Sequence, residues 1–240
     1  MRRILVLLLV SFISSNTLSI AAEPALSAGK VVLLHGLART ASSMLSLEQQ
    51  LNNAGYTVCN IDYPSRKYRI ETLAKTFVLP AIKNCFTEPS GSVHFVTHSL
   101  GGIIVRQLAA EASDVNIGRV VMLSPPNQGS EVVDKLGNWG LFSWINGPAG
   151  RQLGTAQDAL PNQLGPATFE LGIITGNRSI NWILSSLIPG PDDGKVSIDK
   201  AKLQGMQDFL LVEQAHPFIM SNKQVQQQVI HFLHHGQFQH

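Results

Sequence analysis

The most informative segment of this chain is Phe95-Val96-Thr97-His98-Ser99-Leu100-Gly101-Gly102. It places Ser99 between an apolar strand and a helix with an apolar face, the setting of a tight turn that lifts a nucleophilic hydroxyl above a sheet. Backbone N–H groups at the start of such a helix favour developing negative charge. Thr97 stands where the G-x-S-x-G pattern has its first glycine, and a β-branched residue crowds the turn. The alternative interpretation is that Ser99 is only a helix N-cap.

Strands alternate with helices on both sides of this turn. Residues 30–34 are continuously apolar after Lys30, which is typical of a strand that is buried on both faces. The pattern predicts further strands at 57–62, 92–97, 119–123, 169–175 and 208–213, and helices through Leu47, at 70–86, at 100–112 and at the C-terminus. We therefore expect an α/β fold in three layers, with a mostly parallel sheet of about six strands and helices on both faces.

Three local signals refine the helices. Pro80 is expected to kink or split the helix at 70–86, because proline removes a backbone donor. Ser221 and Gln224 form the pattern of a capping box for the last helix, and Gly236 can cap its end. Residues 124–168 are rich in glycine, proline and asparagine and are expected to be irregular.

Composition indicates one globular domain. The 240 residues are 44% hydrophobic and 14% charged, which excludes a disordered chain and supports a sizeable core. Arg2 and Arg3 account for the whole net charge of +2, so the rest of the chain is neutral. No basic patch remains that would bind nucleic acid. We therefore expect no nucleic acid as a partner.

The N-terminus has the pattern of an export signal. Arg2 and Arg3 precede an apolar run at 4–13, and small residues at 19–22 suit cleavage after Ala21 or Ala22. We expect a signal peptide at 1–22, a periplasmic or secreted protein, and a single domain at 23–240. An uncleaved anchor helix is the alternative, although the run is about half the ~20 residues that span a bilayer.

Export would place Cys59 and Cys85 in an oxidising compartment. Cys59 lies early on the strand at 57–62, and Cys85 lies at the end of the helix at 70–86, so both fall at the same edge of the expected sheet. A disulfide is therefore geometrically feasible. The alternative is two small buried hydrophobic side chains.

A serine nucleophile needs a base and an acid, in the chain order Ser…Asp…His for this fold. His216 follows the last apolar strand directly, whereas the other histidines precede Ser99 or lie on the last helix or tail. For the acid we choose Asp193, beside Gly194 in a turn, with Asp192 as the second choice. The expected catalytic residues are thus Ser99, Asp193 and His216.

A second turn is expected next to Ser99. His35-Gly36 follows the strand at 30–34, and a glycine there lets backbone N–H groups reach a substrate oxygen. The N–H groups of Leu37 and Leu100 would then form an oxyanion hole. His35 itself is expected to orient the loop.

These pieces together resemble the α/β hydrolases, and among them the small bacterial secreted lipases and esterases. The matching segments are Leu34-His35-Gly36-Leu37, Thr97-His98-Ser99-Leu100-Gly101-Gly102, Leu123-Ser124-Pro125-Pro126-Asn127-Gln128-Gly129-Ser130, Asp193-Gly194-Lys195-Val196-Ser197 and His216. The resemblance implies a serine hydrolase that cleaves carboxylic esters with apolar acyl groups through an acyl-enzyme. An amidase, a thioesterase, an acyltransferase or a catalytically silent binding protein on the same scaffold stay open. No cofactor and no metal ion are predicted; some lipases of this kind hold calcium, but no matching aspartate pair is identified.

Two apolar segments are expected to flank the site. Trp139, Phe142 and Trp144 lie in a cap-like or lid-like segment at about 127–168, and Trp182 and Leu184 lie at 180–188. They either pack as ordinary core or line an acyl groove whose rim meets lipid. We expect a monomer with a small-molecule or lipid ester as substrate and a transient contact with a lipid surface.

Overall fold

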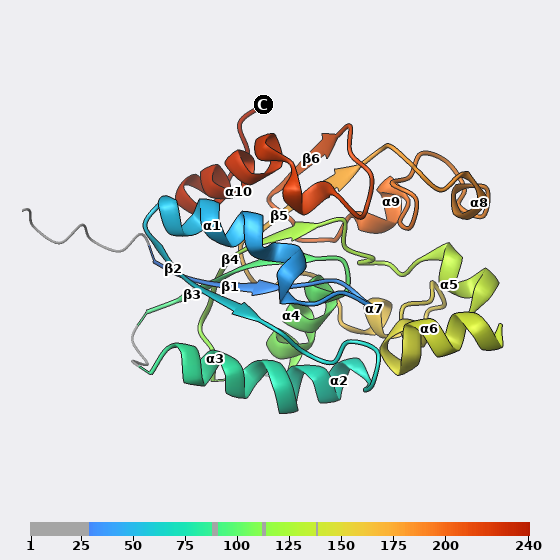
Figure 1. The fold of residues 1–240 in the computed structure, drawn as a ribbon, viewed down its shortest axis with the longest axis horizontal. Helices are drawn as coiled ribbons and strands as arrows, with labels where there is room; N and C mark the ends of the chain where they lie inside the picture. The colour runs from blue at the N-terminus through green and yellow to red at the C-terminus, as the bar shows by residue number, and fades with distance from the viewer. Residues whose placement is uncertain (1–28, 88–90, 112–113, 138) are drawn as a thin grey trace, which may run out of the picture.

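The computed structural model describes residues 29–87, 91–111, 114–137 and 139–240, and it contains one parallel sheet (Figure 1). The expected signal peptide lies outside the described residues. The strands are β1 (Gly29–Leu34), β2 (Tyr56–Ile61), β3 (Val93–His98), β4 (Ile117–Leu123), β5 (Leu171–Gly176) and β6 (Asp208–Val212). Their order in the sheet is β2-β1-β3-β4-β5-β6, and every neighbouring pair is parallel. The predicted parallel six-stranded sheet is confirmed.

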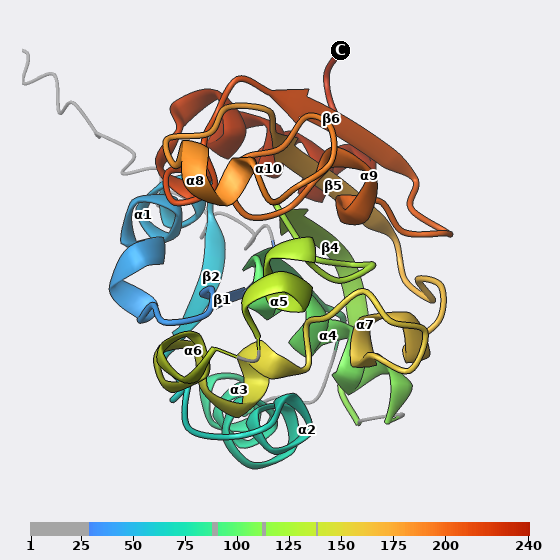
Figure 2. The ribbon, with the colours of Figure 1, turned by 90° about the vertical axis from the view of Figure 1, so that its right-hand side faces the viewer.

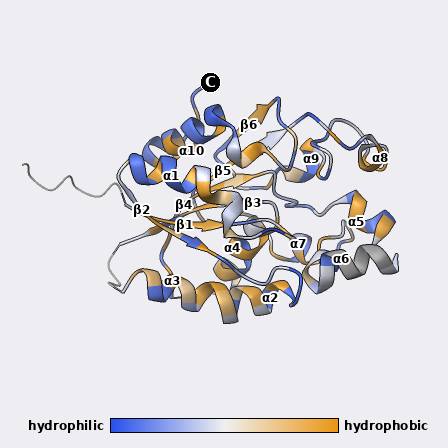
Figure 3. Cartoon of the chain, viewed as in Figure 1, coloured by the Kyte–Doolittle hydropathy of each residue, from blue (hydrophilic) through white to orange (hydrophobic). Residues whose placement is uncertain are grey.

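Helices cover both faces of the sheet, which gives the expected three layers. Above it in Figure 1 lie α1 (Leu45–Asn53), after the short 3-10 helix η1 (Ala41–Met44), and α10 (Lys223–His235). Below it lie α4 (Leu100–Ala110) and the helical run from Ile70 to Cys85. Hydrophobic residues concentrate in the strands and on the inner sides of these helices (Figure 3).

The apolar run of β1 follows from this arrangement. Val31 and Leu33 pack in the core under α1 and α10, whereas Val32 and Leu34 pack in the core against α4. All four side chains are fully buried. A strand whose alternating side chains enter two different cores favours apolar residues on both faces, which explains the run from Val31 to Leu34.

The helical run at 70–85 changes type where the sequence indicated a break. It consists of α2 (Ile70–Thr72), a π-helical segment (Leu73–Val78) and α3 (Leu79–Cys85). Pro80 lies in the first turn of α3, where its missing N–H removes no bond from that helix. The helix that was expected to kink or split at Pro80 therefore continues, and its winding changes there from π-helical to α-helical.

The predicted capping box of the last helix is wrong. Ser221 ends a short 3-10 helix, η3 (Ile219–Ser221), and so cannot adopt the extended conformation of a cap. Asn222 caps α10 instead, because its side chain accepts a hydrogen bond from the Val225 N–H at 3.0 Å. The predicted end at Gly236 is confirmed: it has a φ of 76°, and its N–H donates to the Phe232 carbonyl.

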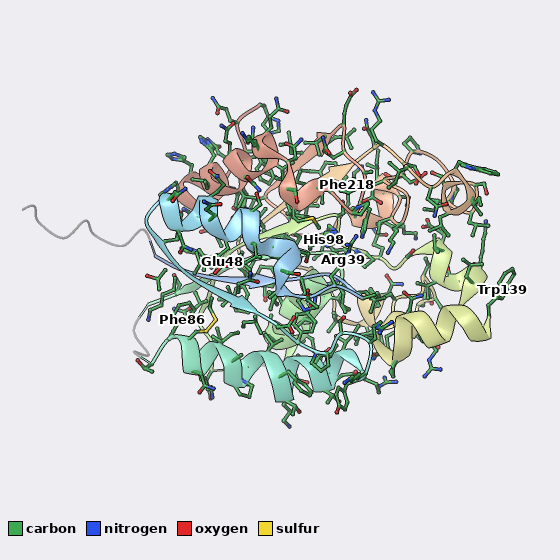
Figure 4. The ribbon with its side chains drawn as sticks, viewed as in Figure 1. Arg39, Glu48, Phe86, His98, Trp139 and Phe218 are labelled. Carbon is green, nitrogen blue, oxygen red and sulfur yellow. A yellow bond between two sulfur atoms is a disulfide. The ribbon has the colours of Figure 1, made fainter. Side chains whose placement is uncertain are left out.

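A disulfide joins Cys59 on β2 to Cys85 at the end of α3, as the sequence indicated. Their Cα atoms are 6.1 Å apart, a normal span for this bond. In Figure 4 the yellow bond lies beside Phe86. The bond fixes the end of α3 to the outer strand of the sheet.

Short helices surround the carboxyl ends of the strands (Figure 2). Residues 124–168 are thus less irregular than expected. The helices are α5 (Glu131–Leu136), α6 (Gly140–Arg151), α7 (Leu160–Gln163), α8 (Trp182–Ser185) and α9 (Ile198–Ala201). In the part of the chain that the structure describes, we find no helix with the length and apolar character to cross a bilayer.

Candidate active site

Ser99 occupies a strained turn between β3 and α4. Its φ is 52° and its ψ is −115°, a conformation that non-glycine residues rarely adopt. Its side chain makes no capping hydrogen bond to α4, so the interpretation as a plain N-cap is wrong. A Cβ at Gly101 would lie 2.5 Å from the Leu34 carbonyl oxygen, so only glycine lets α4 pack this close to β1. Thr97, which replaces the first glycine of the G-x-S-x-G pattern, is fully buried, and the turn forms although this residue is β-branched.

His216 and Asp193 form a buried pair on the loops after β6 and β5. The His216 Nδ1 donates to Asp193 Oδ2 at 2.7 Å, and the His216 main-chain N–H donates to the Asp193 carbonyl at 2.9 Å. The Asp193 side chain is fully buried and His216 is 3% exposed. Backbone N–H groups of Lys195 and Val196 donate to the other carboxylate oxygen, each at 3.0 Å. The imidazole is therefore fixed in the tautomer that leaves Nε2 as an acceptor.

The environment of Asp193 favours its charged form. Burial raises the pKa of this carboxyl, but the His216 charge and the hydrogen bonds from His216 and the Val196 N–H outweigh burial. Its pKa therefore lies below the ordinary value. Asp192, the second choice for the acid, has another role: it accepts hydrogen bonds from the Gly194 N–H and the Ser185 hydroxyl. Asp192 thus holds the turn and α8 in place.

His98, which precedes Ser99, packs against His216. Its Nε2–H donates to the His216 main-chain carbonyl at 3.0 Å, and the two ring centroids are 4.8 Å apart. Burial and the neighbouring His216 hold the pKa of His98 well below its ordinary value, so the ring stays neutral. A Cβ at Gly36 would lie 2.6 Å from His98 Nδ1. His98 is thus packed between the loop after β1 and the loop that carries His216.

The loop after β1 lies beside the Ser99 turn, because β1 pairs with β3. His35 is fully buried, stacks on Tyr63 at 4.1 Å, and its Nδ1 donates to the Gly36 carbonyl at 2.9 Å. These contacts agree with a loop-orienting role. Leu37 lies in the loop after β1, and Leu100 directly follows Ser99. Leu100 is the first residue of α4, where a backbone N–H has no acceptor within the helix. Their role as an oxyanion hole stays a prediction.

A cavity of about 310 Å³ opens at this point. Ser99 and His216 both line it, although no side-chain hydrogen bond joins them within the described residues. Catalytic hydrogen bonds are often loose without substrate. Most of the remaining wall is apolar and comes from the loop after β1, α5, α8 and the neighbouring loops: Leu37, Pro126, Val132, Val133, Leu153, Leu184, Val196 and Pro217.

The expected substrate-binding residues divide into three groups. Leu184 lines the cavity. Trp139 and Trp182 do not line it and are 67% and 78% exposed, so the core interpretation is wrong for both; Figure 4 shows Trp139 at the outer edge of the molecule. The side chains of Phe142 and Trp144 lie outside the described part of the structure.

Sequence reasoning missed two cations. Arg39 and Lys195 line the same cavity as Ser99. Each lies two residues after a predicted site residue, Leu37 and Asp193 respectively. A search for charges next to the predicted site residues would have found both.

The fold and the site together define the α/β-hydrolase class, with a serine turn after a central parallel strand and a histidine–aspartate pair on later loops. The model described as "Alpha/beta hydrolase family" matches residues 31–199, and the chain belongs to this family. No curated protein sequence gives a significant match.

Solved structures of lipolytic enzymes share the fold. The mature Bacillus licheniformis lipase BlEst2 has a TM-score of 0.63 and 21% identity, covering 83% of this chain and 89% of that chain. The monoacylglycerol lipase of Paleococcus ferrophilus has a TM-score of 0.57 and 17% identity, covering 87% and 95%. Phospholipase PlaB from Legionella pneumophila has a TM-score of 0.60 and 17% identity, covering 72% of this chain and 45% of that chain.

Proposed function

We propose that this hydrolase cleaves carboxylic esters with apolar acyl groups, using Ser99, Asp193 and His216. The observation that carries the proposal is the fixed imidazole of His216. Its Nδ1 is bonded to a buried, charged Asp193, and its ring lines the same cavity as the strained Ser99. A triad is recognised by such geometry and roles.

The reaction begins when His216 Nε2 takes the proton of the Ser99 hydroxyl, whose oxygen attacks the ester carbonyl. Asp193 stabilises the imidazolium that forms. The N–H groups of Leu37 and Leu100 hold the negative oxygen of the tetrahedral intermediate. His216 then protonates the leaving alcohol, and water, activated by the same imidazole, releases the acid from Ser99.

The apolar wall of the cavity favours an acyl group with an apolar chain over a peptide-like one. The lipase and phospholipase neighbours point to the same substrate class. An amidase, thioesterase or acyltransferase would use the same residues, and a silent binding protein would not need them.

The test is hydrolysis of 4-nitrophenyl butyrate by the purified chain and by Ser99→Ala and Asp193→Asn. We expect losses on the order of 10⁴-fold or more in kcat for both variants. Matched butyryl amide and thioester substrates separate the other hydrolase classes. Equal rates for the wild type and Ser99→Ala would overturn the catalytic proposal.

We also propose that the protein meets a lipid surface through exposed apolar residues on segments that border the cavity. Trp139 precedes α6, and Ile180, Trp182 and Ile183 lie at α8; their exposed fractions are 67%, 65%, 78% and 58%. Tryptophan suits such a boundary, because it joins a large apolar body to one polar N–H.

The export prediction is supported by the disulfide, which persists in oxidising compartments.

The contact is tested by replacing Trp139 and Trp182 together with serine. We expect selective loss of activity on aggregated long-chain esters, with soluble short-chain activity and Tm retained. Leu45→Ser, at a 56% exposed leucine on α1, is the control. Parallel loss on both substrates would contradict the proposal.

A further inference from the structure

The cavity above Ser99 carries positive charge. Arg39 and Lys195 line it, and none of its described lining residues is acidic. Within the described part of the chain, neither side chain forms an ion pair. Asp193, the carboxylate whose charge acts on Lys195, is already bonded to His216 and to two backbone N–H groups. The two cations are therefore without an anion on a cavity that is otherwise mostly apolar.

The residue before Arg39 is held in an unfavourable backbone conformation. Ala38 has a φ of 57°, which a residue with a Cβ rarely adopts without external support. That support comes from Ser65, which is buried and whose Oγ accepts the Ala38 N–H at 3.1 Å. The Arg39 N–H in turn donates to the Gly36 carbonyl at 3.2 Å. This tight turn sets the direction in which the Arg39 side chain leaves the loop.

Lys195 is held equally firmly on the opposite loop. Its N–H donates to Asp193 Oδ1 at 3.0 Å, and its carbonyl accepts the Ser130 hydroxyl at 2.8 Å. Lys195 and Arg39 thus start from fixed backbones on two different loops and line the same cavity. Figure 4 labels Arg39. The fixed backbones reduce the reorganisation that is needed to receive a ligand.

The two charges act on each other and on the site. Burial lowers the pKa of Lys195, and the Arg39 charge lowers it further, against the opposing effect of Asp193. Both cations also contribute to the lowered pKa of His98. Both side chains are exposed at the cavity, so solvent weakens their mutual repulsion without removing it, and a bound anion would relieve the rest.

We propose that Arg39 and Lys195 form a subsite for an anionic group of the substrate. The substrate class is a carboxylic ester that carries a phosphate, sulfonate or carboxylate within the same cavity as its scissile carbonyl. This inference rests on the proposed ester hydrolysis and adds selectivity for charge. The anion can stand on the acyl chain, on the alcohol, or in the headgroup of an anionic lipid.

The experiment compares kcat/KM for three matched pairs of esters. The 4-nitrophenyl esters of glutarate (as the monoester) and pentanoate place the charge on the acyl chain. The butyrates of 4-hydroxybenzenesulfonate and phenol place it on the alcohol. Phosphatidylglycerol and phosphatidylcholine in mixed micelles place it in a lipid headgroup. The pair that responds identifies the source of the anion.

The variants are Arg39→Gln and Lys195→Gln, with Lys195→Arg to restore the charge. The control is Lys83→Gln, which removes the charge of an exposed lysine on α3. We expect both glutamine variants to lower the ratio of anionic to neutral kcat/KM by about tenfold for at least one pair. Lys195→Arg and Lys83→Gln should keep the wild-type ratio, and added salt should lower it in the wild type.

Unchanged ratios for all three pairs, in both glutamine variants and with salt, would overturn the subsite. If either glutamine variant fails to fold, the salt dependence of the wild-type ratio decides alone. Absence of neutral-ester hydrolysis beyond that of Ser99→Ala would instead refute the proposed function.

Discussion

The strained turn at Ser99 predicts that the nucleophile lowers the stability of the fold. At a φ of 52° and a ψ of −115°, a residue with a Cβ carries strain of about 1–3 kcal/mol. Glycine would relieve that strain, although its greater freedom in the unfolded chain costs about 0.5–1 kcal/mol. Ser99→Gly should therefore be more stable than Ser99→Ala by about 1 kcal/mol, which raises Tm by about 2–4 °C in a domain of this size.

The comparison isolates the backbone, because both variants lose the hydroxyl and only alanine keeps the Cβ. Thermal unfolding of the two purified variants, followed by circular dichroism at one pH and one scan rate, gives the difference. Both variants should be inactive on 4-nitrophenyl butyrate. If Ser99→Gly unfolds at or below the Tm of Ser99→Ala, the turn stores no strain and the reasoning fails.

Three further predictions follow from the contacts. Replacing Cys59 and Cys85 with alanine should cost about 3.5 kcal/mol by loop entropy for a separation of 26 residues, or about 10 °C in Tm; reductant should lower the wild type to the same Tm and leave the variant unchanged. The lowered pKa of Asp193 gives stability that is present above about pH 4 and is lost as the pH falls through the folded pKa, so the difference in Tm between wild type and Asp193→Asn should shrink in acid; a constant difference from pH 3 to pH 7 would contradict this. His98→Phe keeps a ring between the two loops but leaves the His216 carbonyl without its donor, so kcat should fall by about tenfold while KM changes little; an unchanged kcat would show that His98 only fills space.

Most of the fold could be predicted from the sequence, because buried parallel strands leave an unbroken apolar run. The run from Val31 to Leu34 shows this directly, since its alternating side chains enter two cores. Ser99 and His216 could be proposed from their places after strands, and Asp193 from its turn beside Gly194. Their roles stay predictions, but the structure brings Asp193 and His216 into contact and places Ser99 and His216 on one cavity.

The remainder depends on contacts that no local pattern contains. The N-cap of α10 is Asn222 and not the predicted Ser221, because Ser221 belongs to the preceding 3-10 helix. The place of Arg39 depends on a bond between Ala38 and Ser65, which are 27 residues apart. Apolar composition also could not separate core from surface at Trp182, which proved 78% exposed.

The disulfide lies on a strand that, among the described residues, pairs with one neighbour in the sheet. An outer strand presents unpaired N–H and C=O groups to any other extended chain, and such edges are where sheet proteins aggregate. β2 is one of the two outer strands, and Cys59 within it is covalently tied to the end of α3. Reduction would release this tie two positions along the sheet from β3, the strand that leads to Ser99. Its first consequence would therefore be association between molecules through β2, before any change in the chemistry at Ser99.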